Sequence, residues 1–161
     1  MEPIRDALPD ATDVIFREEA LAAANSYRAK HGAPKLEEDA ELTKYAMERA
    51  ASRSRYNRLD AGHDGLRDDL GENIFWGGGK HPGADAVNLW YDEIKNYDWS
   101  QPPGDFMRTG HFTQLVWVGS TKVGMGRVYG AQENESYIVF VFSPPGNYEG
   151  QYGANVLPAR S

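Results

Sequence analysis

Residues Tyr137–Phe142 read Tyr-Ile-Val-Phe-Val-Phe and are apolar at every position. A strand with one face in water alternates apolar and polar side chains, whereas a continuous apolar run is typical of a strand covered on both faces. Pro144 and Pro145 follow closely and end the run. We therefore expect a central strand with other layers packed on both of its faces.

Helical patterns precede the strand patterns along the chain. Spacing and caps predict a first helix that is capped by Asp13 and stopped at His31, a second from about Asp39 to Arg55, and a third from about Ala84 to Asn96. Strands are expected at Leu115–Val118, Val123–Tyr129 and the central run, loops at 56–71 and 97–110, and a break at Gly77–Gly79. This order predicts an α+β fold, a three-layer α-β-α sandwich with a central antiparallel sheet.

Length, charge and cysteine content limit the kinds of domain, covalent link and partner that this chain can have. The 161 residues suit one domain, which we expect at residues 13–161 after an N-terminal tail or strap at 1–12. The absence of cysteine excludes disulfides and thiolate metal sites. The net charge is −7 and neither half is basic, which argues against nucleic acid as a partner.

Two histidines and two glutamates are candidates for chemistry. His63 and His111 lie in polar stretches next to glycine, Glu72 stands where a loop meets an apolar segment, and Glu93 lies beside the apolar stripe of the third helix. No His-Glu-x-x-His pattern is present, so spacing alone does not bring the four together. The other histidines, His31 and His81, are expected to be structural and on the surface, respectively.

The end of the second helix is basic. We expect these cations to form a solvated helix face near the negative end of the helix dipole, with contact to anionic lipid as the alternative. The residues concerned are Lys44, Arg49, Arg53, Arg55 and Arg58.

Six motifs, in order, resemble the signatures of the CAP superfamily, which includes cysteine-rich secretory proteins, insect venom antigen 5 and plant pathogenesis-related proteins. The best-known signature resembles Gly110–Trp117 (GHFTQLVW), and the resemblance extends from about Val14 to Pro158. The other motifs are Tyr27–Leu36, Gly71–Ile74 (GENI), Trp90–Ile94 (WYDEI), Phe142–Tyr148 (FSPPGNY) and Asn155–Pro158. The lack of cysteine resembles the Golgi-associated branch and its yeast and bacterial relatives.

The resemblance implies an α-β-α sandwich with a cleft that holds a tetrad of His63, Glu72, Glu93 and His111. Position 64 is Asp where the family often has Ser, so a Ser-His-Glu protease would lack its nucleophile.

Three roles for the tetrad remain open. The two histidines, with Glu72 and Glu93 as outer or additional ligands, suit Zn²⁺ or another divalent cation in a non-catalytic site. The same groups could form a purely structural network of charge-assisted hydrogen bonds. They could also serve a metal-dependent hydrolase acting on peptides or glycosides. We favour a binding protein with no catalytic residue.

The loop after the third helix is the second candidate site. Tyr97, Trp99 and Phe106 lie in a segment rich in proline and glycine, and the equivalent loop of yeast relatives binds sterols. We expect these rings to bind a lipid or sterol, unless they only cover the edge of the sheet. Peripheral membrane contact and a homodimer are compatible with this reading.

Compartment is open on the sequence. A complete chain would be cytoplasmic or peripheral to a membrane, and a chain whose signal peptide has been removed would be extracellular. Asn134-Glu135-Ser136 is a glycosylation sequon in an expected hairpin turn, and we expect it to carry no sugar.

Overall fold

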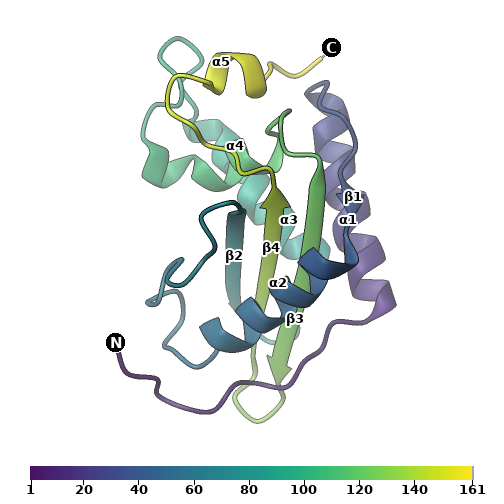
Figure 1. Cartoon of the computed structure of the whole chain (residues 1–161), viewed down its shortest axis with the longest axis vertical. Helices are drawn as coiled ribbons and strands as arrows, with labels where there is room; N and C mark the ends of the chain where they lie inside the picture. The colour runs from purple at the N-terminus through teal and green to yellow at the C-terminus, as the bar shows by residue number, and fades with distance from the viewer. Residues whose placement is uncertain (161) are drawn as a thin grey trace.

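The computed structural model describes residues 1–160 and has one four-stranded sheet with helices on both faces (Figure 1). The strands lie in the order β1-β3-β4-β2. Strand β4 (Glu135–Ser143) pairs antiparallel with β2 (Gly71–Gly78) on one side and with β3 (Lys122–Gly130) on the other. The two-residue strand β1 (Glu37–Glu38) pairs parallel with β3, so the sheet is antiparallel except at this edge.

The central-strand prediction is confirmed. All six side chains from Tyr137 to Phe142 are fully buried, and alternate members enter two different apolar clusters. Ile138, Phe140 and Phe142 face α1 (Val14–Lys30), α3 (Gly83–Asp92) and α4 (Gly110–Leu115). Val139 and Val141 face α2 (Ala40–Arg53). The molecule is therefore the expected three-layer sandwich.

Two glycines of β3 allow α2 to approach the sheet closely. A Cβ atom on Gly126 would lie 2.6 Å from the backbone nitrogen of Met47, and one on Gly124 would overlap the backbone of Leu42. The Val-Gly-Met-Gly sequence thus places side chains on one face of β3 and leaves the other face to the helix backbone. This contact fixes the position of α2, whose last turns reach the candidate site.

Asp13 caps the first helix as expected, and the second helix begins next to Asp39, close to its predicted start. The Asp13 carboxylate accepts a hydrogen bond from the Phe16 N–H, and the Asp39 carboxylate accepts one from the Leu42 N–H. The third helical segment continues from α3 into the 3₁₀ turn η1 (Glu93–Asn96). A second 3₁₀ turn, η2 (Phe106–Arg108), and a short helix, α5 (Tyr152–Asn155), complete the elements.

One predicted strand is wrong, and one observed strand was not predicted. The expected strand at Leu115–Val118 is the end of α4 and the turn after it, because a buried apolar run of four residues suits either structure. Strand β2 is not predicted from the sequence, because Gly71 belongs to the predicted loop and Gly77 and Gly78 belong to the predicted break. Pairing along its whole length with β4 outweighs that low strand propensity.

The N-terminal segment is a strap held against the sandwich (Figure 1). Leu8 is buried among the residues on the α2 side, Asp10 forms a bridge with Val128, and the Ala11 N–H donates to the Arg127 carbonyl. No helix in residues 1–160 combines the length and apolar character that a membrane span requires.

Candidate functional site

A cleft of about 190 Å³ lies where the start of β2 meets α4. We call it the tetrad cleft. Three of the four predicted residues line it, and the fourth, Glu93, stands behind His111. The lining residues are His63, Glu72, Asn73, Phe106, Met107, Gly110, His111 and Asn147.

The first half of the site is built around Glu72. Its side chain is fully buried on β2, and its Oε1 lies 2.7 Å from Nδ1 of His63. Arg49, from α2, donates two hydrogen bonds to the same carboxylate, with Nε 2.7 Å from Oε2 and Nη2 2.8 Å from Oε1. Two parallel N–H donors match a carboxylate in geometry and charge, so this ion pair is strong and directional.

The environment of Glu72 stabilises its charged form. Burial by itself would raise the pKa of Glu72, but the hydrogen bonds from His63 and Arg49 and the positive charge of Arg49 outweigh burial and lower it. In turn, the contact with Glu72 outweighs the burial of Arg49 and raises the pKa of the guanidinium. Glu72 is therefore a carboxylate acceptor, and His63 donates its Nδ1 hydrogen to it.

The loop that carries His63 is held by two arginines of α2. Arg49 Nη1 donates to the Asp64 carbonyl at 2.6 Å, and Arg53 Nη1 donates to the carbonyls of Ala61 and Gly62 at 3.1 Å each. Loop carbonyls on both sides of His63 are therefore tied to one helix.

The expectation of a solvated basic face is wrong for these two arginines. Arg49 and Arg53 are 5% and 6% exposed, whereas Lys44, Arg55 and Arg58 are exposed as expected. Both buried arginines share a helix face with Ala46 and Ala50, which are fully buried.

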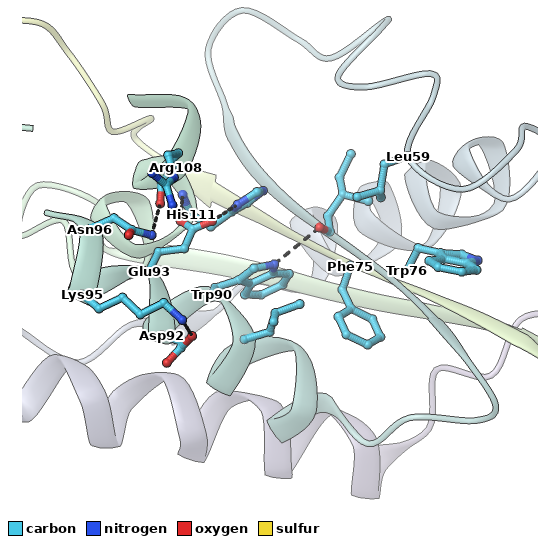
Figure 2. Close-up of a pocket in the computed structure, with 12 residues that line it drawn as sticks. Leu59, Phe75, Trp76, Trp90, Asp92, Glu93, Lys95, Asn96, Arg108 and His111 are labelled. Carbon is cyan, nitrogen blue, oxygen red and sulfur yellow. Dashed lines mark hydrogen bonds and ion pairs between the residues drawn. The ribbon is translucent and has the colours of Figure 1, made fainter. Parts of the chain in front are cut away.

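The second half of the site is built on a helix start. Glu93 Oε2 lies 2.8 Å from Nδ1 of His111, and Glu93 Oε1 accepts the backbone N–H groups of His111 and Phe112 at 2.9 and 3.0 Å. Figure 2 shows the Glu93 and His111 side chains pointing toward one another, with Trp90 beside them. Free amides and the positive end of the helix dipole favour a carboxylate at this position, so Glu93 caps α4 while it orients His111.

Asn73 joins the two halves. It follows Glu72 on β2, is 1% exposed, and its Nδ2 donates to the His111 carbonyl at 3.0 Å. Sequence reasoning missed both Asn73 and Arg49 as site residues. Each residue had a signal in the sequence. Asn73 lies within the GENI motif, and Arg49 lies at helical spacing from the apolar residues of the second helix.

The two histidines present the same ring atom for further chemistry. Each engages a carboxylate through Nδ1, and no atom of residues 1–160 forms a hydrogen bond with Nε2 of either ring. A carboxylate on Nδ1 fixes the tautomer that leaves a lone pair on Nε2, the usual arrangement behind a metal-binding histidine. The donor set is incomplete, however, since the described chain has no group of three or more His, Cys, Asp or Glu placed to hold a metal ion.

The aromatic loop borders the same cleft. Trp99, Phe106 and Met107 are 43%, 47% and 85% exposed, and the last two line the tetrad cleft. Tyr97 differs from expectation because it is buried in the core beneath Trp99, with the ring centroids 4.6 Å apart. Burial raises the pKa of Tyr97 to about 12, and its hydroxyl has no hydrogen-bond partner among the described residues.

Comparison with known proteins agrees with the fold. The chain is 36% identical over 147 residues to human Golgi-associated plant pathogenesis-related protein 1, covering 90% of this chain and 94% of that one. It is 37% identical over 139 residues to the pathogenesis-related protein PR-1 of Medicago truncatula, covering 84% and 78%. A solved structure of NaASP2 with Zn²⁺ superposes with a TM-score of 0.68 at 25% identity, over 95% of this chain and 90% of that one. The model of the cysteine-rich secretory protein (CAP) family matches residues 21–142, and the chain belongs to that family.

Proposed function

We propose that the protein is a non-catalytic binding protein whose tetrad cleft holds a divalent cation, with Zn²⁺ the best match, between Nε2 of His63 and Nε2 of His111. The observation that carries this proposal is the shared use of Nδ1 on a carboxylate, which leaves one free nitrogen on each ring in the same cleft. Imidazole nitrogen is a preferred ligand of Zn²⁺.

Glu72 and Glu93 would act as partners of the ligands rather than as ligands. Both are committed to a histidine and to a second donor, Arg49 in one case and the first amides of α4 in the other. A cation with two protein ligands would need water or a bound molecule to complete its coordination, and would polarise that molecule as a Lewis acid.

Hydrolysis by the same tetrad is the weaker reading. A general acid at neutral pH needs a raised pKa, and the pKa of Glu72 is lowered. Glu72 is also fully buried and already bonded to Arg49 and His63. At position 64 the chain has Asp, so no serine stands beside His63 as a nucleophile.

Lipid or sterol binding at the aromatic loop is a second candidate function. Phe106 and Met107 line the tetrad cleft with their side chains exposed, and Trp99 is exposed on the same loop, so apolar side chains are available to a lipid beside the cleft. Tyr97 would support Trp99 from the core side. Lipid carriage should survive in a variant lacking both His63 and His111, whereas a hydrolase would lose all activity.

Calorimetric titration with Zn²⁺ tests the cation site. Wild-type protein should bind at pH 7.5 and bind more weakly at pH 5.5, because coordination needs a ring nitrogen that carries no proton. The double variant His63→Ala, His111→Ala should lose binding. His81→Ala is a matched control, since His81 bonds Asp85 and the Gly78 carbonyl away from the cleft. Binding that survives in the double variant would refute the proposed site.

A further inference from the structure

Strand β2 forms an edge of the sheet, and its outer backbone groups can be assigned from the register. The Gly79 N–H donates to the Asn134 carbonyl, which continues the β2–β4 pairing by one residue. Because hydrogen-bonded and non-hydrogen-bonded pairs alternate in an antiparallel ladder, Ile74, Trp76 and Gly78 direct their N–H and C=O groups away from β4. Two contacts agree with this assignment, since the carbonyls of Ile74 and Gly78 both accept bonds from outside the sheet.

Those two bonds cover the edge on either side of Trp76. The indole Nε1 of Trp90 donates to the Ile74 carbonyl at 3.4 Å, and the His81 ring meets the Gly78 carbonyl at 2.7 Å. Between them, neither the backbone N–H nor the carbonyl of Trp76 has a hydrogen-bond partner in residues 1–160. An edge strand with one uncovered donor and acceptor pair is a template for another extended chain.

A groove of about 370 Å³ lies at this edge, lined by apolar side chains in one part and by polar and charged side chains in the other. Leu59 and Leu89 line it and are 49% and 57% exposed, with Phe75, Trp76 and Trp90 also lining it. Figure 2 shows Leu59 and Trp76 at one end of the groove, and Arg108 and Asn96 at the other. An extended segment in this groove would have apolar contacts near Trp76 and polar contacts toward Arg108.

The far end of the groove carries an unmatched positive charge. The carboxylate of Asp92 pairs with Lys95 at 2.6 Å, and Glu93 pairs with His111. Arg108 is exposed, and its guanidinium forms no ion pair or hydrogen bond within the described chain. Arg108 precedes His111, whose carbonyl bonds Asn73, so this charge lies toward the N-terminal end of β2.

We propose that this groove is a docking site for an extended peptide segment of a partner protein, which adds to the sheet antiparallel to β2. Its backbone pairs with Trp76, its side chains are aliphatic at successive positions, and an acidic residue toward its C-terminal end meets Arg108. From Trp76 to Asn73 the strand covers about 10 Å, which four residues of an extended segment span, so a six-residue peptide reaches past this stretch. This mode obtains affinity from main-chain hydrogen bonds and selectivity from the side-chain contacts.

The probe is the peptide Ser-Val-Ile-Val-Ile-Asp-amide with a fluorophore coupled to its N-terminal amine, measured by fluorescence anisotropy. We expect binding that weakens at least threefold in Arg108→Gln and in Leu89→Ser, and does not change in the charge-matched control Lys35→Gln. Hydrogen exchange followed by NMR should show slower exchange of the Trp76 amide when peptide is bound. Zinc titration of the same variants should be unaltered, which separates this site from the proposed cation site.

N-methylation of the peptide tests strand pairing independently of register. Methylating amides of one parity should weaken binding at least tenfold, because only those amides donate to β2, whereas methylating the other parity should change it less than threefold. Equal effects at both parities, no slowing of exchange at Trp76, or no binding at 1 mM peptide would each overturn the proposal.

Discussion

Each half of the tetrad is a hydrogen-bonded pair of one histidine and one glutamate, but the two pairs are held in place by different means. His63 lies on an irregular loop, its side chain is 54% exposed, and its partner Glu72 is fully buried and held by Arg49. His111 lies in the first turn of α4, and its partner Glu93 is partly exposed and caps that helix. One half therefore depends on a buried arginine from a different layer, and the other depends on a helix terminus next to it.

This difference predicts unequal sensitivity to mutation. A buried carboxylate that loses its arginine is left with an uncompensated charge, which is among the most destabilising changes in a protein interior. A partly exposed capping carboxylate is surrounded by water that can replace some of its bonds. Substitutions in the His63 half should lower the free energy of unfolding more than substitutions in the His111 half. Both halves should matter equally for binding a cation.

Removal of Arg49 should have the largest effect. Arg49→Met leaves Glu72 with His63 as its remaining side-chain partner and releases the Asp64 carbonyl, and we expect the free energy of unfolding to fall by about 3–5 kcal/mol. Urea denaturation measures the loss. Adding Glu72→Leu to this variant should recover part of it, and a single-variant loss below about 1 kcal/mol would contradict the description of the His63 half.

Acid should remove the stability that Glu72 supplies. Because the folded-state pKa of Glu72 is lowered, its contribution is complete above the ordinary carboxyl pKa of about 4.3 and is lost as the pH falls through the folded value. Between pH 7 and pH 3, wild-type protein should therefore lose more unfolding free energy than Glu72→Gln. Parallel pH profiles for the two proteins would show that Glu72 is not stabilised in its charged form.

Loss of the carboxylate charge in the other half should cost less than loss of Arg49. Glu93→Gln keeps an oxygen for the α4 amides but removes the charge that favours the helix terminus and the His111 ring, so we expect a loss of about 1 kcal/mol. Thermal and urea unfolding of Glu93→Gln and Arg49→Met, measured side by side, rank the two losses of unfolding free energy directly. A larger loss for Glu93→Gln than for Arg49→Met would reverse the comparison.

Trp99→Ala should have the smallest effect on stability, under about 0.5 kcal/mol, because the ring is 43% exposed on a loop. If the aromatic loop binds sterol, the same variant should bind it roughly tenfold to a hundredfold more weakly, since a buried ring contributes about 1.5–3 kcal/mol. Thermal melting and sterol binding should be measured on one preparation. A marked fall in melting temperature with unchanged binding would assign Trp99 to the core.

The sandwich was predictable because its strongest signals are local. Tyr137–Phe142 is apolar on both parities, and Asp13 and Asp39 cap helices whose apolar residues recur at helical spacing. Strand β2 was not predictable in this way, because Gly71, Gly77 and Gly78 lack strand propensity and only pairing with β4 makes the segment extended. The residue pattern within a segment does not indicate pairing with a strand that lies about sixty residues away in the chain.

The candidate site was predictable only in part. The resemblance to known motifs pointed to His63, Glu72, Glu93 and His111, and the structure pairs each histidine with one glutamate. The residues that hold these pairs came from the structure. Arg49 was interpreted as a solvated cation because basic residues near a helix end usually are, and only the tertiary contact with Glu72 reveals its burial.

The most direct test of the site is a Zn²⁺ titration of the two single variants, His63→Ala and His111→Ala, beside wild type and the double variant. If both rings bind one ion, each single substitution should weaken binding at least tenfold, and the double substitution should cost little more than either single one. Additive losses, or a single variant that binds as tightly as wild type, would contradict a shared site in the tetrad cleft.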